Sequence, residues 1–269
     1  MIFLKICILV VTLSLAVLQL AHCKTKSNEF DFFTFTQVWP MVACLKDRSE
    51  EYKCHISRNV TGWTIHGLWP SGGRSSKGPT FCNNSSKFNE SAVEKLLPEL
   101  DVYWPNLQSE TTRDDFWAYE WSKHGTCAKL VKETRNEYLY FKKALDLFQQ
   151  INFTGILTDI GVIPDDNKLY DVLNILNKIT PRLSKVKGVK PRLSCYKYKE
   201  QFYLNSVIIC FTKQFEMTSC LPTPRDNRLY FKSLKDIRKI EKVENLVNND
   251  NLISCPRDNL VKYPTIRYD

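Results

Sequence analysis

The 269-residue sequence predicts an α+β fold in which a central antiparallel sheet packs against several helices and disulfides cross-link the chain. Helical and strand patterns are mixed along it without the regular rhythm of a parallel sheet. Hydrophobic residues make up 43% of the chain, enough for a substantial core. We see no internal repeat, low-complexity block or Gly/Ser-rich linker. We therefore expect residues 24–269 to form a single domain.

Five stretches predict strands, because they are rich in aromatic and β-branched residues or alternate in polarity between turn residues. These stretches are 30–39, 63–68, 189–199, 202–212 and 228–232. Turn-prone residues close the second of them, where Trp-Pro is followed by Ser-Gly-Gly.

Four stretches predict helices: 91–100, 114–127, 137–150 and 169–179. The third is the clearest, with an apolar stripe at Tyr138, Phe141, Leu145 and Phe148. The second has acidic residues in its first turn, where they suit the helix dipole. We expect the fourth to end before Pro181, since proline disrupts a helix.

Residues 1–23 have the layout of a secretory signal peptide. Lys5 precedes an apolar run over 6–20, and Ala21 and Cys23 stand at the −3 and −1 positions of a small-residue cleavage site. A signal anchor is the alternative, but the run is shorter than the ~20 residues that span a bilayer. We expect cleavage, no membrane span, and a protein that is secreted or lumenal in the secretory or lysosomal pathway.

Eight cysteines follow the signal peptide, at 44, 54, 82, 127, 195, 210, 220 and 255. An even number in an exported chain predicts four disulfides. A zinc site is the alternative, but the sequence has no CxxC pair and only three histidines after residue 23: His55, His66 and His124. We therefore predict no metal.

Sequons and charge agree with export and with a polyanionic partner. Five asparagines are candidates for N-glycosylation in surface loops: Asn59, Asn83, Asn84, Asn89 and Asn152. The formal net charge is +9, and its excess lies mostly at 178–199 and 225–242. Such charge attracts RNA or anionic cell surfaces, but by itself it predicts only non-specific attraction.

The helix predicted at 114–127 carries an unusual set of side chains. At 100° per residue, one face holds Tyr119, Lys123, Phe116, Glu120 and His124. Trp117 and Trp121 lie beyond that arc and suit the core. An ordinary surface helix with a Glu–His pair is the alternative. Bracketing aromatics, the glycine after His124 and the nearby Cys127 favour a functional site.

The strand predicted at 63–68 places His66 among large apolar residues, where an imidazole needs a partner or a purpose. A structural histidine is the alternative. Both His66 and His124 directly precede a glycine, Gly67 and Gly125. We interpret these glycines as making room for the backbone of a ligand.

Together, I-H-G-L-W-P at 65–70 and F-W-A-Y-E-W-S-K-H-G-T-C at 116–127 resemble the two active-site signatures of the ribonuclease T2 family. Further agreement comes from F-D-F-F at 30–33, W-P at 39–40 and Y-F-K-K-A-L at 140–145. The resemblance spans roughly residues 30 to 255. It implies the disulfide-linked α+β fold of that family.

The resemblance implies a metal-independent endoribonuclease that cleaves single-stranded RNA through a 2′,3′-cyclic phosphate and needs no cofactor. Cleavage requires a base for the 2′-OH proton and an acid for the 5′-oxygen, and two imidazoles can divide that work. We assign His124 as base and His66 as acid in the forward step. Glu120 and Lys123 match the family residues that stabilise the negatively charged phosphorane.

Three aromatic residues are expected to bind substrate. By resemblance, Trp69 stacks on the base on the 5′ side, and Phe116 lines the pocket of the following base. Core packing is the alternative for both. Tyr119 stands where many relatives have a phosphate-binding histidine, and tyrosine can still donate a hydrogen bond. Val38 replaces a frequent glutamine and Ser71 replaces an aspartate that helps to read the base, so the base preference is left open.

The family's disulfide pairing is Cys44–Cys54, Cys82–Cys127, Cys195–Cys255 and Cys210–Cys220. We expect the chain to act as a monomer. Two other functions are alternatives to the enzyme. One is a catalytically weakened secreted effector that binds RNA or cell surfaces, which the change at Tyr119 would favour. The other is a disulfide-rich inhibitor or toxin that acts through protein contacts.

Overall fold

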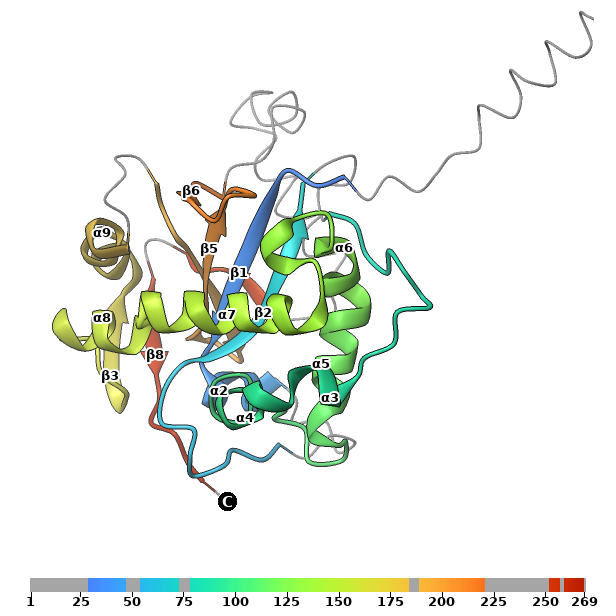
Figure 1. Ribbon diagram of the computed structural model, residues 1–269. Coiled ribbons are helices and arrows are strands. Elements are labelled where there is room, and N and C mark those ends of the chain that lie inside the picture. The colour runs from blue at the N-terminus through green and yellow to red at the C-terminus, as the bar shows by residue number, and fades with distance from the viewer. Residues whose placement is uncertain are drawn as a thin grey trace, which may run out of the picture.

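The computed structural model describes residues 29–46, 54–72, 78–183, 189–220, 252–256 and 259–268. It has the α+β architecture that the sequence predicts, with a mixed sheet behind several helices (Figure 1). The predicted signal peptide and the strand expected at 228–232 lie outside the described residues.

The main sheet has the strand order β2-β1-β5-β4-β7. Its strands are β1 Phe32–Val38, β2 Thr64–Ser71, β4 Arg192–Tyr198, β5 Gln201–Phe211 and β7 Leu252–Ser254. β6 Met217–Thr218 pairs with β5, and β8 Leu260–Tyr263 joins β5 to β3 Asp165–Asp171. The β5–β8 pair is parallel, whereas every other pairing of described strands is antiparallel. The four predicted strands within the described residues are confirmed.

The α-helices are α2 Pro40–Lys46, α3 Glu90–Val93, α4 Leu97–Tyr103, α5 Arg113–Glu120, α6 Thr126–Ala128, α7 Glu137–Ile151, α8 Phe153–Asp159 and α9 Val172–Leu183. In Figure 1, α7 crosses in front of the sheet, α5 and α6 lie on the side of β2, and α8 and α9 lie on the opposite side, near β3. α7 follows the prediction closely, and Asn136 caps it by accepting a hydrogen bond from the Leu139 N–H. The helix predicted at 91–100 is three short pieces, with a 3-10 turn at Glu94–Leu96 between α3 and α4.

The helix predicted at 169–179 is wrong at both ends. Residues 169–171 belong to β3, and α9 begins only at Val172 because the Asp171 side chain accepts a hydrogen bond from the Asn174 N–H. α9 then continues through Pro181 to Leu183. Pro181 has no N–H and so removes one helical hydrogen bond, but the side chains of Thr180 and Arg182 donate to the carbonyls of Leu176 and Lys178 in the same turn.

Buried aromatic residues join the helices to strand β2. Trp117 and Trp121 are almost fully buried, as the sequence predicts. The Tyr140 hydroxyl of α7 donates to the Leu68 carbonyl at 2.9 Å. The Trp104 indole donates to the His66 carbonyl at 3.2 Å, and the Trp117 indole donates to the Trp104 carbonyl at 2.7 Å. These bonds fix the edge strand that carries His66 against the helices.

The disulfides join Cys44 to Cys54, Cys82 to Cys127, Cys195 to Cys255 and Cys210 to Cys220, which is the family pairing. The Cys82–Cys127 bridge ties α6 to the segment that follows β2. The segment after β2 and the segment that contains α6 are therefore linked covalently.

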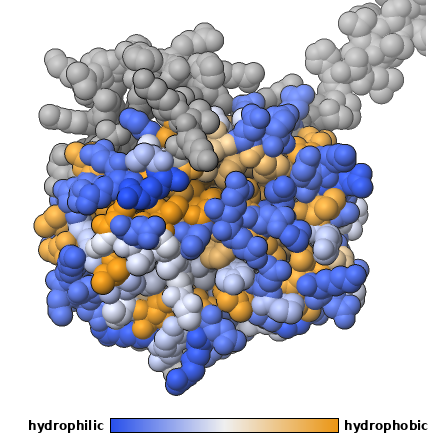
Figure 2. Space-filling view, turned by 60° about the vertical axis from the view of Figure 1, so that its left-hand side comes forward, coloured by the Kyte–Doolittle hydropathy of each residue, from blue (hydrophilic) through white to orange (hydrophobic). Residues whose placement is uncertain are grey.

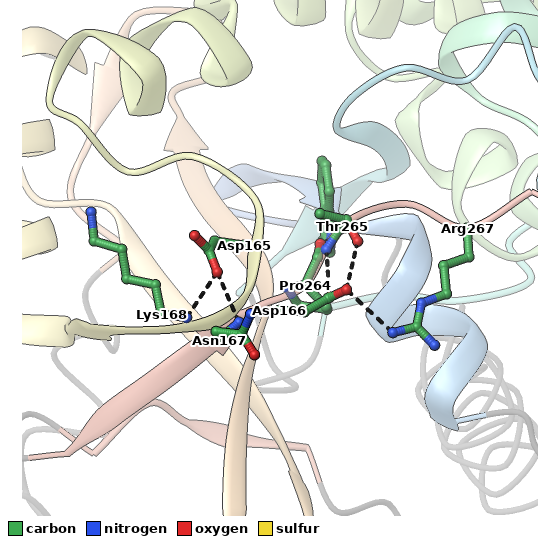
Figure 3. Close-up of polar contacts among 8 residues, drawn as sticks. Asp165, Asp166, Asn167, Lys168, Pro264, Thr265 and Arg267 are labelled. Carbon is green, nitrogen blue, oxygen red and sulfur yellow. Dashed lines mark hydrogen bonds and ion pairs between the residues drawn. The ribbon is translucent and has the colours of Figure 1, made fainter.

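The C-terminal segment is held by Asp166, which lies at the start of β3 (Figure 3). Its carboxylate accepts hydrogen bonds from the backbone and hydroxyl of Thr265 and from the guanidinium of Arg267. These bonds lower the pKa of Asp166, the Thr265 hydroxyl having the largest effect. The Trp39 indole donates to the Pro264 carbonyl at 2.9 Å. The last described residues are thus part of the folded structure.

All five sequon asparagines are exposed, as a glycosylation acceptor must be. Figure 2 looks at the side that carries α8, β3 and α9, where apolar patches lie among hydrophilic side chains. Ile163, Leu169 and Leu173 are each more than two-fifths exposed. Within the described ranges, no helix has the length and apolar character needed to cross a membrane.

Candidate active site

His66 lies in a β-bulge of strand β2. Thr36 of β1 pairs with Gly67, but the next residue, Gln37, pairs with Ile65, so His66 has no residue opposite it on β1. Side chains three positions apart point to opposite faces of a regular strand. The bulge instead lets His66 and Trp69 meet, with ring centroids 5.0 Å apart.

His124 lies in a π-helical turn, so the continuous α-helix predicted at 114–127 is wrong in its middle. Between α5 and α6, Trp121–Gly125 forms a π-helix, and the Thr126 N–H donates to the Trp121 carbonyl. π-turns of this kind occur frequently at functional sites. The Thr126 hydroxyl donates to the Ser122 carbonyl at 2.9 Å, which stabilises the irregular turn.

The five side chains predicted to share one face of this helix divide between the interior and the solvent. Glu120 is only 2% exposed and His124 only 9%, whereas Tyr119 is 49% exposed. Lys123 and Phe116 have intermediate exposure. Glu120 and His124 thus join the buried side of the helix, and Tyr119 marks its outer edge.

The two histidines meet at the indole of Trp69. Its ring centroid is 5.0 Å from that of His66 and 5.4 Å from that of His124. The imidazoles are therefore no farther apart than the sum of these distances. His66 also contacts Phe116, with 6.1 Å between the two ring centroids. Two segments that are distant in sequence thus bring both histidines to one site.

Glu120 is the buried acid of the site. The Trp69 indole donates to its Oε2 at 2.7 Å. Burial raises the pKa of Glu120 to about 8, although the Trp69 hydrogen bond and the charge of Lys123 oppose this shift. In neutral and acidic solution the side chain is therefore an uncharged carboxylic acid, which can donate a hydrogen bond.

His124 is an uncharged imidazole in neutral and mildly acidic solution. Its pKa is lowered to about 3, mainly by burial and in addition by the charges of Lys123 and His66. Among the described residues, its Nδ1 is buried and has no hydrogen-bond partner. An uncharged imidazole has one ring nitrogen without a hydrogen, which can accept a proton.

Lys123 supplies the positive charge. Its ammonium group donates to the Tyr119 hydroxyl at 2.8 Å and lies 4.9 Å from the centroid of the Tyr119 ring. These contacts hold the flexible lysine in one place. Tyr119 therefore orients the ammonium group of the residue that precedes the buried His124.

The two glycines make room for aromatic rings, which corrects the interpretation that they admit a ligand backbone. A Cβ at Gly67 would lie 2.1 Å from Trp69 Nε1 and 2.5 Å from Glu120 Oε2. A Cβ at Gly125 would lie 2.2 Å from the Trp121 ring. Gly67 is thus required for the contact between Trp69 and Glu120.

Two of the three positions that depart from the family pattern, Val38 and Ser71, are buried, whereas the third, Tyr119, is exposed. Val38 is the last residue of β1. The Ser71 hydroxyl accepts from Thr34 at 2.8 Å and donates to the Trp69 carbonyl at 3.0 Å. In this arrangement Ser71 supports the backbone of Trp69.

One aromatic side chain beside this cluster was missed by the sequence analysis. Phe81 is 42% exposed, and its ring lies 6.4 Å from that of Tyr119. It directly precedes Cys82, which is bridged to Cys127, and its N–H donates to the carbonyl of Lys123 at 2.9 Å. The disulfide pairing could have placed it there from the sequence.

Within the part of the chain that the structure describes, no group of three or more His, Cys, Asp or Glu side chains could hold a metal ion. Metal independence stays a prediction. The cluster instead contains two imidazoles, an uncharged carboxylic acid and an ammonium group. Such a set can transfer protons and stabilise negative charge at a phosphate.

A sequence model of the Ribonuclease T2 family matches residues 30–220. The chain belongs to this family. It is 40% identical to ribonuclease Oy of Magallana gigas over 72% of this chain and 88% of that protein. It is 32% identical to ribonuclease T2 of Danio rerio over 74% of this chain and 76% of that protein.

The solved structures lead to the same family. The fold resembles that of human RNase T2 with a TM-score of 0.62 and 25% identity. That comparison covers 88% of this chain and 99% of the human one. The α+β fold predicted from the sequence is therefore confirmed by the solved structures of relatives.

Proposed function

We propose that this ribonuclease T2-type endoribonuclease cleaves single-stranded RNA without a metal, using His66 and His124 as its proton-transfer pair. The observation that carries the proposal is the contact of both imidazoles with the single indole of Trp69. The sequence predicts the two histidines as a pair only through family resemblance. Their positions in the fold support that pairing independently.

In the proposed reaction, the 2′-oxygen attacks the phosphorus while the bond from phosphorus to the 5′-oxygen breaks. The products are a 2′,3′-cyclic phosphate and a free 5′-hydroxyl. His124 takes the 2′-OH proton, because its lowered pKa keeps it uncharged before substrate binds. The negative charge of a bound phosphodiester raises the pKa of His124 and helps it to keep that proton. His66 donates the proton that the 5′-oxygen acquires.

Glu120 and Lys123 stabilise the negatively charged phosphorane. The raised pKa of Glu120 favours the neutral acid, which donates a hydrogen bond without adding negative charge next to the phosphate. Lys123 contributes an ammonium group that Tyr119 already holds in place. Preorganised donors of this kind are commonly the largest contribution to catalysis.

Trp69, Phe116 and Tyr119 bind the substrate. Trp69 and Phe116 both contact His66, and both are only partly buried. Bases on either side of the scissile phosphate can therefore stack on these two aromatic rings. Tyr119 positions Lys123 toward the phosphate. Stacking tolerates different bases and suits single-stranded RNA.

Residues 1–23 direct the chain into the secretory pathway and are cleaved there, and the mature protein acts as a monomer with glycans at one or more of its five sequons. The four disulfides support this route, because such bonds form in oxidising compartments. The exposed sequon asparagines are accessible to glycosylation.

The test is cleavage of dinucleotides and single-stranded RNA in excess EDTA, with mass analysis of the products. Wild-type protein should produce the 2′,3′-cyclic phosphate. His66→Phe and His124→Phe should each lower kcat by orders of magnitude without unfolding the protein. The double variant should be no worse than the poorer single one, because the pair acts as a unit. His55→Phe, at an exposed histidine outside the cluster, is the matched control.

Wild-type rates in either single variant would refute the assignment. Absence of any cleavage by pure wild-type protein would favour the effector that only binds RNA or cell surfaces. A biological effect that survives both histidine substitutions would favour the inhibitor or toxin.

A further inference from the structure

Phe81 and Tyr119 form an exposed aromatic corner. Their ring centroids are 6.4 Å apart and their planes meet at 76°. Phe81 is 42% exposed and Tyr119 is 49% exposed. Among the described residues, the two rings contact each other and no third aromatic ring. A flat heterocycle can stack on one ring while its edge meets the other.

The backbone holds Phe81 in an unfavourable conformation. Its φ is +51°, a left-handed value that costs a bulky residue of order 1 kcal/mol or more. The Phe81 N–H donates to the Lys123 carbonyl at 2.9 Å, and Cys82 is bridged to Cys127. A large side chain that is both strained and exposed contributes little to the core. Such residues cluster at sites of binding.

The corner adjoins a cation of the candidate active site. The Lys123 ammonium group lies 4.9 Å from the centroid of the Tyr119 ring, and Lys123 directly precedes His124. Successive bases in RNA are separated by one phosphate. An RNA strand whose scissile phosphate lies at the two histidines and Lys123 can therefore continue to the aromatic corner.

We infer that Phe81 and Tyr119 form a third base-binding subsite, outside the two that Trp69 and Phe116 provide. Its ligand is a nucleobase of single-stranded RNA beyond the two nucleotides that flank the scissile phosphate. Aromatic stacking and an ammonium group give the combination of contacts that binds single strands with little sequence preference. The inference rests on the proposed function for the position of the two flanking nucleotides.

The test compares binding of 2′-O-methyl oligonucleotides, which cannot be cleaved, to the full protein by fluorescence anisotropy. Phe81→Asn removes the ring, and asparagine tolerates a positive φ, so the variant should fold. Its Kd for a hexanucleotide should rise about tenfold, since stacking on an aromatic contributes about 5- to 150-fold in affinity. Its Kd for a dinucleotide should rise much less. Phe81→Tyr keeps an aromatic ring and should bind the hexanucleotide as tightly as wild-type protein does.

An equal change for both oligonucleotides, or no change for either, would overturn the third subsite. Loss of binding in Phe81→Tyr as well as in Phe81→Asn would also overturn it, because stacking needs only an aromatic ring. The outcome is separable from that of the proposed function. Wild-type protein that binds the hexanucleotide through Phe81 but cleaves no dinucleotide would support the subsite and refute catalysis. Cleavage of dinucleotides by wild-type protein, with no effect of Phe81→Asn on binding, would support catalysis and refute the third subsite.

Discussion

Replacing Glu120 with glutamine tests whether the Glu120 side chain is uncharged in the folded protein. Burial raises its pKa to about 8, whereas in the unfolded chain the carboxyl titrates at its ordinary value near 4.5. Between these two values the folded state holds a proton that the unfolded state has lost. The free energy of unfolding must then fall as the pH rises.

The size of this effect follows from linkage. One proton bound only by the folded state changes the free energy of unfolding by about 1.4 kcal/mol per pH unit. From about pH 5.5 to about pH 7.5 the contribution of Glu120 is therefore a loss of about 2–3 kcal/mol. His124 acts in the opposite direction. Between its pKa of about 3 in the folded protein and its ordinary value of 6.5, only the unfolded chain binds the proton, so the free energy of unfolding falls as the pH falls. Together these two groups favour maximum stability in mildly acidic solution.

The assay is urea unfolding of wild-type protein and Glu120→Gln across this pH range. Glutamine has nearly the same shape and can still accept the Trp69 hydrogen bond, but it does not titrate. The difference in stability between the two proteins isolates Glu120, since all other groups titrate alike in both. As the pH rises over this range, the free energy of unfolding of wild-type protein should fall by about 2–3 kcal/mol relative to that of Glu120→Gln. A difference that stays constant would show that Glu120 is ionised in the folded state.

Two further substitutions test the packing around the site and the C-terminal anchor. Gly67→Ala should cost about 1–3 kcal/mol of stability and lower kcat/KM at least tenfold, because the added methyl group overlaps Trp69 and Glu120; unchanged unfolding and cleavage would contradict the close contact. Asp166→Ala should lower stability by about 1 kcal/mol, measured by urea unfolding, because it removes the acceptor of the Thr265 hydrogen bonds. The kcat/KM of Asp166→Ala should match that of the wild type. If the variant lost activity without losing stability, the hydrogen bonds of Asp166 to Thr265 would have to affect the geometry of the active site.

Periodicity predicted the elements whose apolar faces are regular. α7 and the β4–β5 pair fall close to their expected positions. β3 was missed because most of its residues are polar and exposed, so it has no hydrophobic alternation to detect. The pairing of β5 with β8 could not be predicted either, since it joins residues that are distant in sequence.

The residue types of the site were predicted from two motifs, but their geometry was not. Spacing along the chain cannot place His66 near His124, because that proximity depends on how the helices pack against the edge strand β2. The helical wheel also failed to separate Glu120, which is buried, from Tyr119, which is exposed. Only the fold shows that Trp69 is hydrogen-bonded to the acid.

Both candidate catalytic histidines lie where a regular element is interrupted, and this explains why pattern-based prediction was least accurate there. His66 occupies a β-bulge and His124 a π-helical turn. Each irregularity disrupts the regular backbone hydrogen bonding and reorients a side chain, which is a common use of bulges near functional sites. Without the bulge, His66 and Trp69 would point to opposite faces of β2, and the indole could not contact both imidazoles. The irregular backbone is therefore a requirement of the site, and the regular periods of the sequence describe the core that supports it.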